Sequence, residues 1–469
     1  MTRKAHPEPW LATTAAALVT ATVAGCALQA PPASEELNRE AYGERVPPGA
    51  WVAPGAGAGP VQAGWLDTFG DERLKALVAE AVARNPDLRA AAAQVEQAVA
   101  YVSIAGGSVY PAINLLGKTS GGDGSGSEPL NAGILSVSWE LDVWGRVRYG
   151  RRAAEDQYAA AAADYAYAQQ SIAALVVRGW VLACEAALQR QLAAESLASA
   201  ERLLSLAGDR QRVGIGSELE VRLARGNVET FRDVVRQLDL GKEQALRALE
   251  LLVGRYPSAE LQAATALPQV SADVPAGVPS ELLERRPDVI AAERRVAAAF
   301  SVARQAEAAR LPQFTLTGTG SYLDSDILVL QDVDNPIWGI GLGLVMPLYA
   351  GGALQAQVEL RTAEQKEAVA RYAGVGLKAF GEVEGALAAE RAALERQSIL
   401  ASQVAEGERA LELENIRYRV GKTDLRNVAQ QQLAVYGARS SLLRVQAERV
   451  AQRVNLYLAL GGGFDAAPT

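Results

Sequence analysis

The chain has 469 residues, of which 49% are hydrophobic, with one histidine, two cysteines and a formal net charge of −8. The acidic balance argues against a nucleic-acid partner. The scarcity of histidine and cysteine removes the groups that most metal sites and Ser-His-Asp triads require. We therefore expect no enzyme, no catalytic residues and no metal site.

Residues 1–25 have the pattern of a lipoprotein signal peptide. Arg3 and Lys4 precede Leu11–Gly25, an uncharged segment too short to span a bilayer by itself. The small residue Gly25 directly before Cys26 resembles the bacterial lipobox, in which the cysteine is acylated and becomes the first residue. We predict a covalent lipid on Cys26 and no other cofactor. An ordinary signal peptide with a chance cysteine is the alternative.

Removal of this segment changes the inventory of reactive groups. His6 is lost, and Cys184 becomes the single thiol after the lipidated cysteine, so a disulfide within the chain is excluded. Ala27 follows Cys26 where lipoproteins kept in the inner membrane often carry aspartate, so the predicted location is the outer membrane. Residues 26–64 are rich in Pro, Gly and Ala and predict an extended, lipid-anchored tether without secondary structure.

The rest of the chain repeats itself, with copies predicted at 65–255 and 281–463, a connector at 256–280 and a tail at 464–469. The pair Asn85-Pro86 recurs as Arg286-Pro287, 201 residues later. Asn85 is a strong N-cap with proline at the first helical position, whereas Arg286 is a weaker cap. A tandem duplication of this length defines the architecture.

Each copy contains a predicted strand hairpin, at about 111–141 and 312–348. In the second copy Phe314, Leu316 and Tyr322 alternate with small hydroxylated residues over about ten positions, which is typical of a transmembrane β-strand. Four strands cannot close a barrel, and open edges in lipid leave backbone groups unpaired. We therefore expect the chain to oligomerise, and three copies would supply twelve strands.

A helix without proline follows each hairpin, over Gly145–Arg212 and Gly352–Arg419. Each is roughly 100 Å long at 1.5 Å per residue and returns after an Arg-Val-Gly turn as a second helix. The two helical hairpins are predicted at about 145–254 and 352–460. Ser217 begins a capping box after the first turn.

Several motifs in order resemble the TolC-like outer-membrane duct family, and its lipid-anchored NodT-type branch in particular. They are Ser138–Arg146 (SWELDVWGR), Arg286–Val289 with Ala292-Glu293, Met346–Tyr349 before Gly351-Gly352, and Glu382-Val383-Glu384. The resemblance covers about Trp65 to Gly463. It implies a mixed α and β membrane protein whose homotrimer combines a 12-stranded β-barrel with a periplasmic α-barrel and an equatorial belt.

The resemblance also implies the function, a passive outer-membrane duct of a tripartite efflux system. Its partners would be a periplasmic adaptor, an inner-membrane RND-type pump and outer-membrane lipid. The adaptor-docking tips would be the two turns, Arg212, Val213, Gly214 and Arg419, Val420, Gly421, although any tight turn between helices also favours glycine. The alternatives are a duct for type I protein secretion and a structural periplasmic coiled-coil lipoprotein.

The periplasmic gate is where the chain departs from this family pattern. An aspartate is common about nine residues beyond the glycine of the second turn, and Gln430 stands there in this chain. Asp424 and Arg426 lie nearer the turn. We predict that these two residues set the constriction through ion pairs between protomers.

Overall fold

The computed structural model describes residues 28–43, 49–54, 56–57, 59, 61, 63–120, 130–270, 274–324 and 337–464. The predicted signal peptide, Cys26 and both loops that connect the strands of the hairpins lie outside these residues. The chain divides into two compact units. The first contains Met1–Val46, Ala93–Ala162 and Ala291–Gly374, and the second contains Pro47–Ala92, Ala163–Ile290 and Val375–Thr469.

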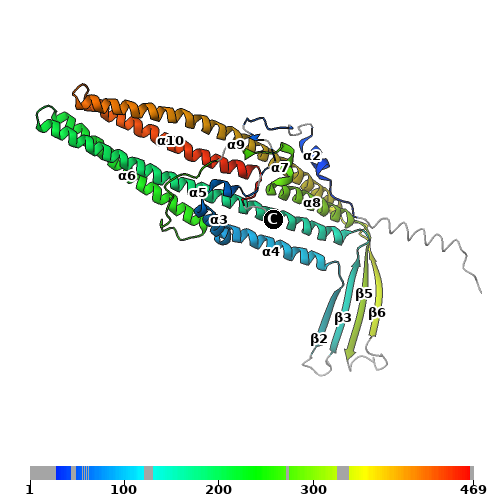
Figure 1. Cartoon of the computed structure of the whole chain (residues 1–469). Helices are drawn as coiled ribbons and strands as arrows, with labels where there is room; N and C mark the ends of the chain where they lie inside the picture. The colour runs from blue at the N-terminus through cyan, green and yellow to red at the C-terminus, as the bar shows by residue number, and fades with distance from the viewer. Residues whose placement is uncertain are drawn as a thin grey trace, which may run out of the picture. The chain divides into compact units, whose positions relative to one another are not determined.

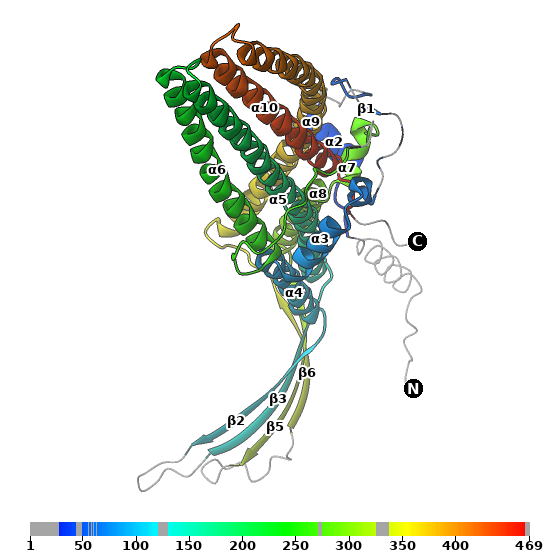
Figure 2. The same ribbon diagram turned by 60° about the vertical axis from the view of Figure 1, so that its left-hand side comes forward.

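The first unit is built around a four-stranded antiparallel sheet (Figure 1). Its strands are β2 (Ala112–Ser120), β3 (Leu130–Leu141), β5 (Gln313–Asp324) and β6 (Ile337–Val345), in the order β2-β3-β5-β6. The two hairpins are joined because β3 pairs with β5, with Trp139 opposite Leu316. Figure 2 shows the four strands curving together as one sheet. β2 and β6 remain as its two edges.

The pairing register sorts the strand residues onto two faces, because directly opposed residues of neighbouring strands share a face. We call one the apolar face, which carries Ile113, Leu115, Gly117, Gly133, Leu135, Val137, Trp139, Leu141, Phe314, Leu316, Gly318, Gly320, Tyr322, Trp338, Ile340, Leu342 and Leu344. We call the other the hydroxyl face, which includes Ser136, Ser138, Thr315, Thr317, Thr319, Gly339, Gly341 and Gly343. The alternation predicted within single strands therefore continues across most of the sheet. It breaks down toward the loop ends of the strands, where Leu116, Ile134 and Ile337 lie on the hydroxyl face and the paired positions of Thr119 and Asn131 belong to the apolar face.

Two long helical hairpins follow the strand pairs, α5 (Arg146–Arg212) with α6 (Glu218–Val253), and α9 (Ala353–Arg419) with α10 (Leu425–Ala459). α5 and α9 contain 67 residues each. The predicted capping box is present: the Ser217 hydroxyl accepts a hydrogen bond from the Glu220 amide, and the Glu220 carboxylate accepts one from the Ser217 amide. The start of α6 after the turn is therefore determined by residues close together in the sequence.

Shorter elements lie between the hairpins. They are α2 (Ser34–Tyr42), the 3-10 helix η1 (Trp65–Phe69), α3 (Glu72–Arg84), α4 (Pro86–Gly107), α7 (Pro279–Arg285), α8 (Pro287–Ala308) and the two-residue strands β1 (Ala56–Gly57) and β4 (Val274–Pro275). The parallel pairing of β1 with β4 joins the N-terminal segment to the connector between the repeats. The Trp65 indole donates to the Gly462 carbonyl at 3.1 Å, so the N-terminal and C-terminal segments also meet in the second unit.

Among the described residues, α5 is the one helix that is long and apolar enough to cross a membrane, with a mean hydropathy of 1.7 over 18 residues. Half of that stretch is buried inside the structure. A helix at the centre of a helical layer has the same composition, so this window does not by itself indicate a membrane span.

The prediction of an extended tether over residues 26–64 is wrong in part. Helix α2 forms within it and buries Leu37 and Tyr42, which are 2% and 7% exposed. The Tyr372 hydroxyl donates to the Asn38 side-chain oxygen at 2.7 Å and holds the helix in place. These few apolar contacts were hidden by the average composition of the segment, which is rich in Pro, Gly and Ala.

The reading of Arg286 as a weak helix cap misses its role. Its side chain is 1% exposed and donates to Asp288 and Glu382, each at 2.7 Å, and to the Ala459 carbonyl at 3.1 Å. Burial opposes the charged form, but the two carboxylates outweigh burial and raise the pKa of the guanidinium. In the first copy the Asn85 amide donates to the carbonyl of Leu252. Leu252 and Ala459 are 207 residues apart, which is the same offset as between the two turns. Different side chains therefore donate hydrogen bonds to equivalent carbonyls in the two copies.

Replacing Arg286 by leucine is expected to destabilise the second unit by about 3 kcal/mol, because two partly buried carboxylates lose their shared counter-ion. Arg285→Leu is the matched control, since its 3.6 Å pair with Glu281 is more exposed and such pairs contribute less than about 1 kcal/mol. Thermal unfolding in detergent, followed by circular dichroism, compares the two variants. An equal loss in both would contradict this account of Arg286.

Candidate functional site

The two predicted docking tips are matched helix-ending turns. Gly214 and Gly421 have positive φ angles of 79° and 72°, which favour glycine. In each turn the glycine amide and the next amide bond back to carbonyls three and five residues earlier, the Schellman pattern. Val213 and Val420 are 69% and 63% exposed, so each turn presents an apolar side chain to its surroundings. Arg212 and Arg419 are also exposed.

The first turn contains a second glycine whose role the sequence reading missed. A Cβ atom on Gly216 would lie 2.9 Å from the Gln211 amide nitrogen and 2.9 Å from the Arg210 Cβ atom. The close return of the chain after Gly214 therefore excludes any larger residue. The pattern Gly-Ile-Gly-Ser is the sequence signal for this tight return.

Arg210 and Tyr418 link the two helical hairpins near the tips. The Arg210 guanidinium donates to the Tyr418 carbonyl at 3.1 Å and lies 4.7 Å from the centre of the Tyr418 ring. Tyr418 is fully buried, in one cluster with Leu203 and Leu425. Burial, followed by the charge of Glu220, raises the pKa of the Tyr418 hydroxyl. The sequence reading identified the exposed arginine Arg419 and missed the buried tyrosine beside it.

A buried polar relay lies farther along the same hairpins. The Asn227 amide donates to the Gln432 side-chain oxygen at 3.0 Å, and the Gln432 amide donates to the Ser199 hydroxyl at 3.3 Å. Asn227 and Gln432 are each 7% exposed. Because a buried amide without a partner is costly, the relay fixes the register of α10 against α5 and α6.

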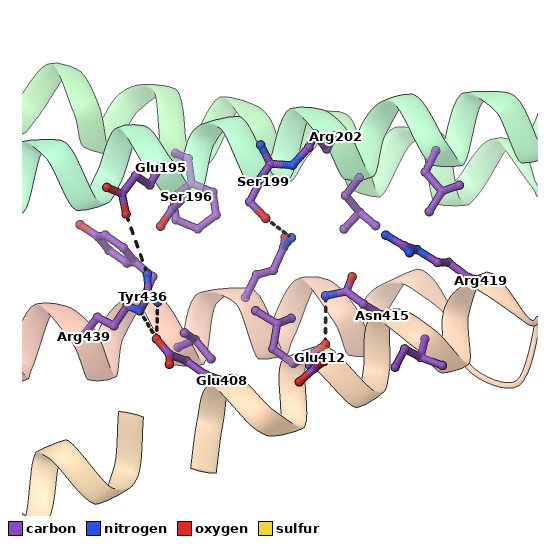
Figure 3. Close-up of a pocket in the computed structure, with 17 residues that line it drawn as sticks. Glu195, Ser196, Ser199, Arg202, Glu408, Glu412, Asn415, Arg419, Tyr436 and Arg439 are labelled. Carbon is purple, nitrogen blue, oxygen red and sulfur yellow. Dashed lines mark hydrogen bonds and ion pairs between the residues drawn. The ribbon is translucent and has the colours of Figure 1, made fainter. Parts of the chain in front are cut away.

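A cavity of 960 Å³ lies next to this relay, between α5 and the pair α9 and α10 (Figure 3). Arg439 pairs with Glu408 and lies 4.0 Å from Glu195 on the opposite wall. Arg202 and Arg419 line the same cavity and have no hydrogen bond or ion pair within the described part of the chain. Glu412, on α9, also lines the cavity. The cavity therefore has paired charges at one place and charged groups of both signs without a partner among the described residues elsewhere.

The predicted gate residues all lie at the start of α10. Asp424 is the N-cap, and its carboxylate accepts a hydrogen bond from the Asn427 amide at 3.1 Å. Arg426 and Gln430 are exposed, and Arg426 has no ion pair among the described residues. Asp424 and Arg426 do not pair within one chain, so any pair between them joins two protomers.

No group of three or more His, Cys, Asp or Glu side chains among the described residues could hold a metal ion. Cys184 is buried, and burial is the main cause that raises the pKa of its thiol to about 11. The thiol is therefore protonated near neutral pH and is a poor nucleophile.

Comparison with known proteins assigns the architecture. A family model described as outer membrane efflux protein matches residues 77–255 and 278–462, one segment in each predicted repeat. The chain belongs to the outer membrane efflux protein family. It is thus a channel component of an efflux system in the outer membrane, and its family consists of transporters. The predicted membership of the outer-membrane duct family and the predicted fold class are confirmed.

Individual relatives match along most of their length. The chain is 32% identical to the pyoverdine export outer membrane protein OpmQ of Pseudomonas putida, over 90% of this chain and 93% of that protein. It is 28% identical to the cation efflux system protein CusC of Escherichia coli K12, over 86% of this chain and 89% of the relative. The solved outer-membrane channel OprN superposes with a TM-score of 0.80 at 25% identity, covering 90% of this chain and 99% of OprN.

Replacing Arg210 by alanine is expected to loosen the link between the two tips. The loss of a charge-assisted hydrogen bond to the Tyr418 carbonyl corresponds to about 1.5 kcal/mol, or roughly tenfold faster amide exchange in residues 416–428. Hydrogen–deuterium exchange with mass spectrometry measures this change. Arg212→Ala is the control, because the Arg212 side chain is 78% exposed and pairs only with Asp209 of its own helix. Unchanged exchange in Arg210→Ala would contradict the link.

Proposed function

We propose that three copies of this chain form a lipid-anchored duct that passively conducts small molecules out of the periplasm. The observation that carries the proposal is the two-faced sheet with two unpaired edges. β2 and β6 run in opposite directions, so β6 of one copy can pair with β2 of the next in the same antiparallel pattern. Three copies supply twelve strands, which is an even number suited to closure.

The two faces support an orientation for the closed sheet. The apolar face would contact lipid, since charged and polar groups there are costly. The hydroxyl face, with its threonines and glycines, would line the lumen. Small side chains such as Gly339, Gly341 and Gly343 leave space inside the barrel. A lumen lined mainly by small side chains suits a passive conduit.

The partners of the duct would be a periplasmic adaptor and an inner-membrane RND-type pump. The adaptor would dock at the two tips, where Val213 and Val420 are exposed and where Arg212 and Arg419 supply charge. The names of the two relatives mention pyoverdine and cations. These cargoes share small size, which supports export of small molecules with selection made at the pump.

The lipid anchor is the part of the proposal that depends on Cys26, which lies outside the described residues. Cys26→Ser is expected to abolish acylation and leave the signal peptide uncleaved, because the lipobox cysteine is the residue modified. Mass spectrometry of the N-terminal peptide from membranes measures both changes. An unmodified N-terminal peptide in the unaltered protein would overturn the anchor and leave the channel assignment untouched.

Conductance in planar bilayers tests the duct and its gate together. We expect the purified trimer to conduct ions, and Arg426→Ala to raise its open probability. Each exposed ion pair with Asp424 of a neighbour holds about 1 kcal/mol, or about fivefold in the opening equilibrium, and the variant trimer loses three such pairs. Asp424→Asn should act in the same direction, since asparagine keeps the helix cap and removes the charge.

Arg417→Ala is the control for this measurement, because Arg417 pairs with Glu414 within its own helix. Unchanged opening in both Arg426→Ala and Asp424→Asn would remove the predicted gate. The absence of any conductance in the unaltered trimer and in both gate variants would overturn the duct.

A further inference from the structure

The apolar face of the sheet contains a hollow. Its volume is 490 Å³, and three adjacent strands line it. Its walls are Leu135 and Val137 of β3 and Trp338 and Ile340 of β6, which lie on either side of β5. The floor is the backbone of β5 from Gly318 to Gly320, with Thr319 between the two glycines, and Gly339 of β6 also lines the hollow. This volume is within the range of small-molecule sites, and its side-chain walls are apolar.

The hollow exists because of two glycines on a face that otherwise carries large side chains. A Cβ atom on Gly320 would lie 2.6 Å from the Trp338 ring, so the indole lies across β5 at that point. A Cβ atom on Gly318 would contact only the Val137 Cβ atom, at 3.8 Å. A larger residue at Gly318 therefore fits the backbone and fills the hollow. Gly133, on the same face, has nothing within 4 Å of its Cβ position and does not line the hollow.

A second feature of the first unit lies at the base of β3 and β5. The Leu28 side chain lies over Gly145, where a Cβ atom would come within 2.4 Å of it, and the Gln29 amide donates to the Tyr149 hydroxyl at 2.8 Å. The Trp144 indole donates to the Pro312 carbonyl at 2.8 Å and so ties the end of β3 to the start of β5. The start of the described chain is therefore held at this strand junction.

Chain length connects the two features. Cys26 precedes Leu28 by two residues, which span at most about 7 Å. From Leu141 at the base of β3, Val137 and Leu135 are four and six residues away along the strand, or about 14 to 20 Å at 3.4 Å per residue. One leaflet of a hydrocarbon core about 30 Å thick is about 15 Å deep. Strands of a transmembrane barrel tilt by about 35 to 45°, so the 14 to 20 Å along β3 corresponds to about 10 to 16 Å of depth. An acyl chain that starts at the base and spans one leaflet would therefore reach the height of the hollow.

We propose that one acyl chain of the Cys26 lipid runs up the apolar face and is seated in the Gly318–Gly320 hollow. The proposal rests on the lipid anchor and on the outward orientation of the apolar face proposed above. The occupant would be a saturated hydrocarbon chain, held by contact with Leu135, Val137 and the Trp338 indole. The anchor would then be a packed part of the membrane sheet and would fix the junction of β3 and β5 next to lipid.

Photo-crosslinking in native membranes tests this seat. Ile340 is 88% exposed and is replaced by p-benzoylphenylalanine, a residue that inserts into nearby C–H bonds on irradiation. Leu116, 59% exposed on the hydroxyl face of β2 and absent from the hollow, receives the same probe as the control position. We expect the N-terminal lipopeptide joined to the β6 peptide from Ile340, at several times the yield from Leu116. Peptide mass spectrometry identifies the products.

Filling the hollow provides the second arm. Gly318→Leu in the Ile340-probe protein is expected to reduce the crosslink severalfold, whereas Gly133→Leu on the same face leaves it unchanged. Equal yields from Ile340 and Leu116, or a crosslink insensitive to Gly318→Leu, would overturn the seat. A crosslink to free phospholipid in place of the lipopeptide would overturn the proposed occupant.

The same peptide spectra separate this proposal from the one on which it rests. A lipidated N-terminal peptide without a crosslink to β6 contradicts the seat alone. An N-terminal peptide without lipid contradicts the anchor, and with it the seat. Thermal unfolding of Gly318→Leu and Gly133→Leu, each compared with the unaltered trimer, shows whether either variant has failed to assemble.

Discussion

The two edge strands of the four-stranded sheet, β2 and β6, constrain the whole molecule, because each has no neighbour on one side. In lipid no water replaces a missing backbone partner, so the free amide and carbonyl groups of β2 and β6 must bond to other strands. The strand order leaves these edges antiparallel to each other, which lets identical copies continue the sheet. Closure of the sheet gives the apolar face and the hydroxyl face different surroundings, lipid outside and the lumen inside. Assembly is therefore a condition of the fold, and the long helical hairpins must be arranged with the same symmetry.

The tandem repeat supplies the hairpins in matched pairs, and the structure shows what duplication preserved. The turn geometry at Gly214 and Gly421 is the same in both copies. The tie at the start of α4 and α8 is kept in position but changed in chemistry. Asn85 bonds a carbonyl with an amide, whereas Arg286 bonds the equivalent carbonyl with a guanidinium that also collects two carboxylates. Both copies therefore keep a side-chain hydrogen bond from the residue before the helix to the carbonyl at the same repeat position, Leu252 or Ala459.

Features with a local cause could be predicted from the sequence. The strand faces follow from a period of two, the long helices from the absence of proline, and the turns and caps from Gly214, Gly421 and Ser217. The features that were missed depend on residues far apart in the chain. Arg286 meets Glu382 across 96 residues, Arg210 meets Tyr418 across 208, and Tyr372 meets Asn38 across 334. No local pattern reports such contacts, and the hollow at Gly318 likewise depends on three paired strands.

Electron microscopy of the protein extracted from the outer membrane in mild detergent tests the central claim most directly. The account predicts a threefold tube longer than about 100 Å, the length of one 67-residue helix, with a twelve-stranded barrel at one end and helical tips at the other. A monomer, or a compact particle without a central channel, would contradict closure of the sheet by identical copies.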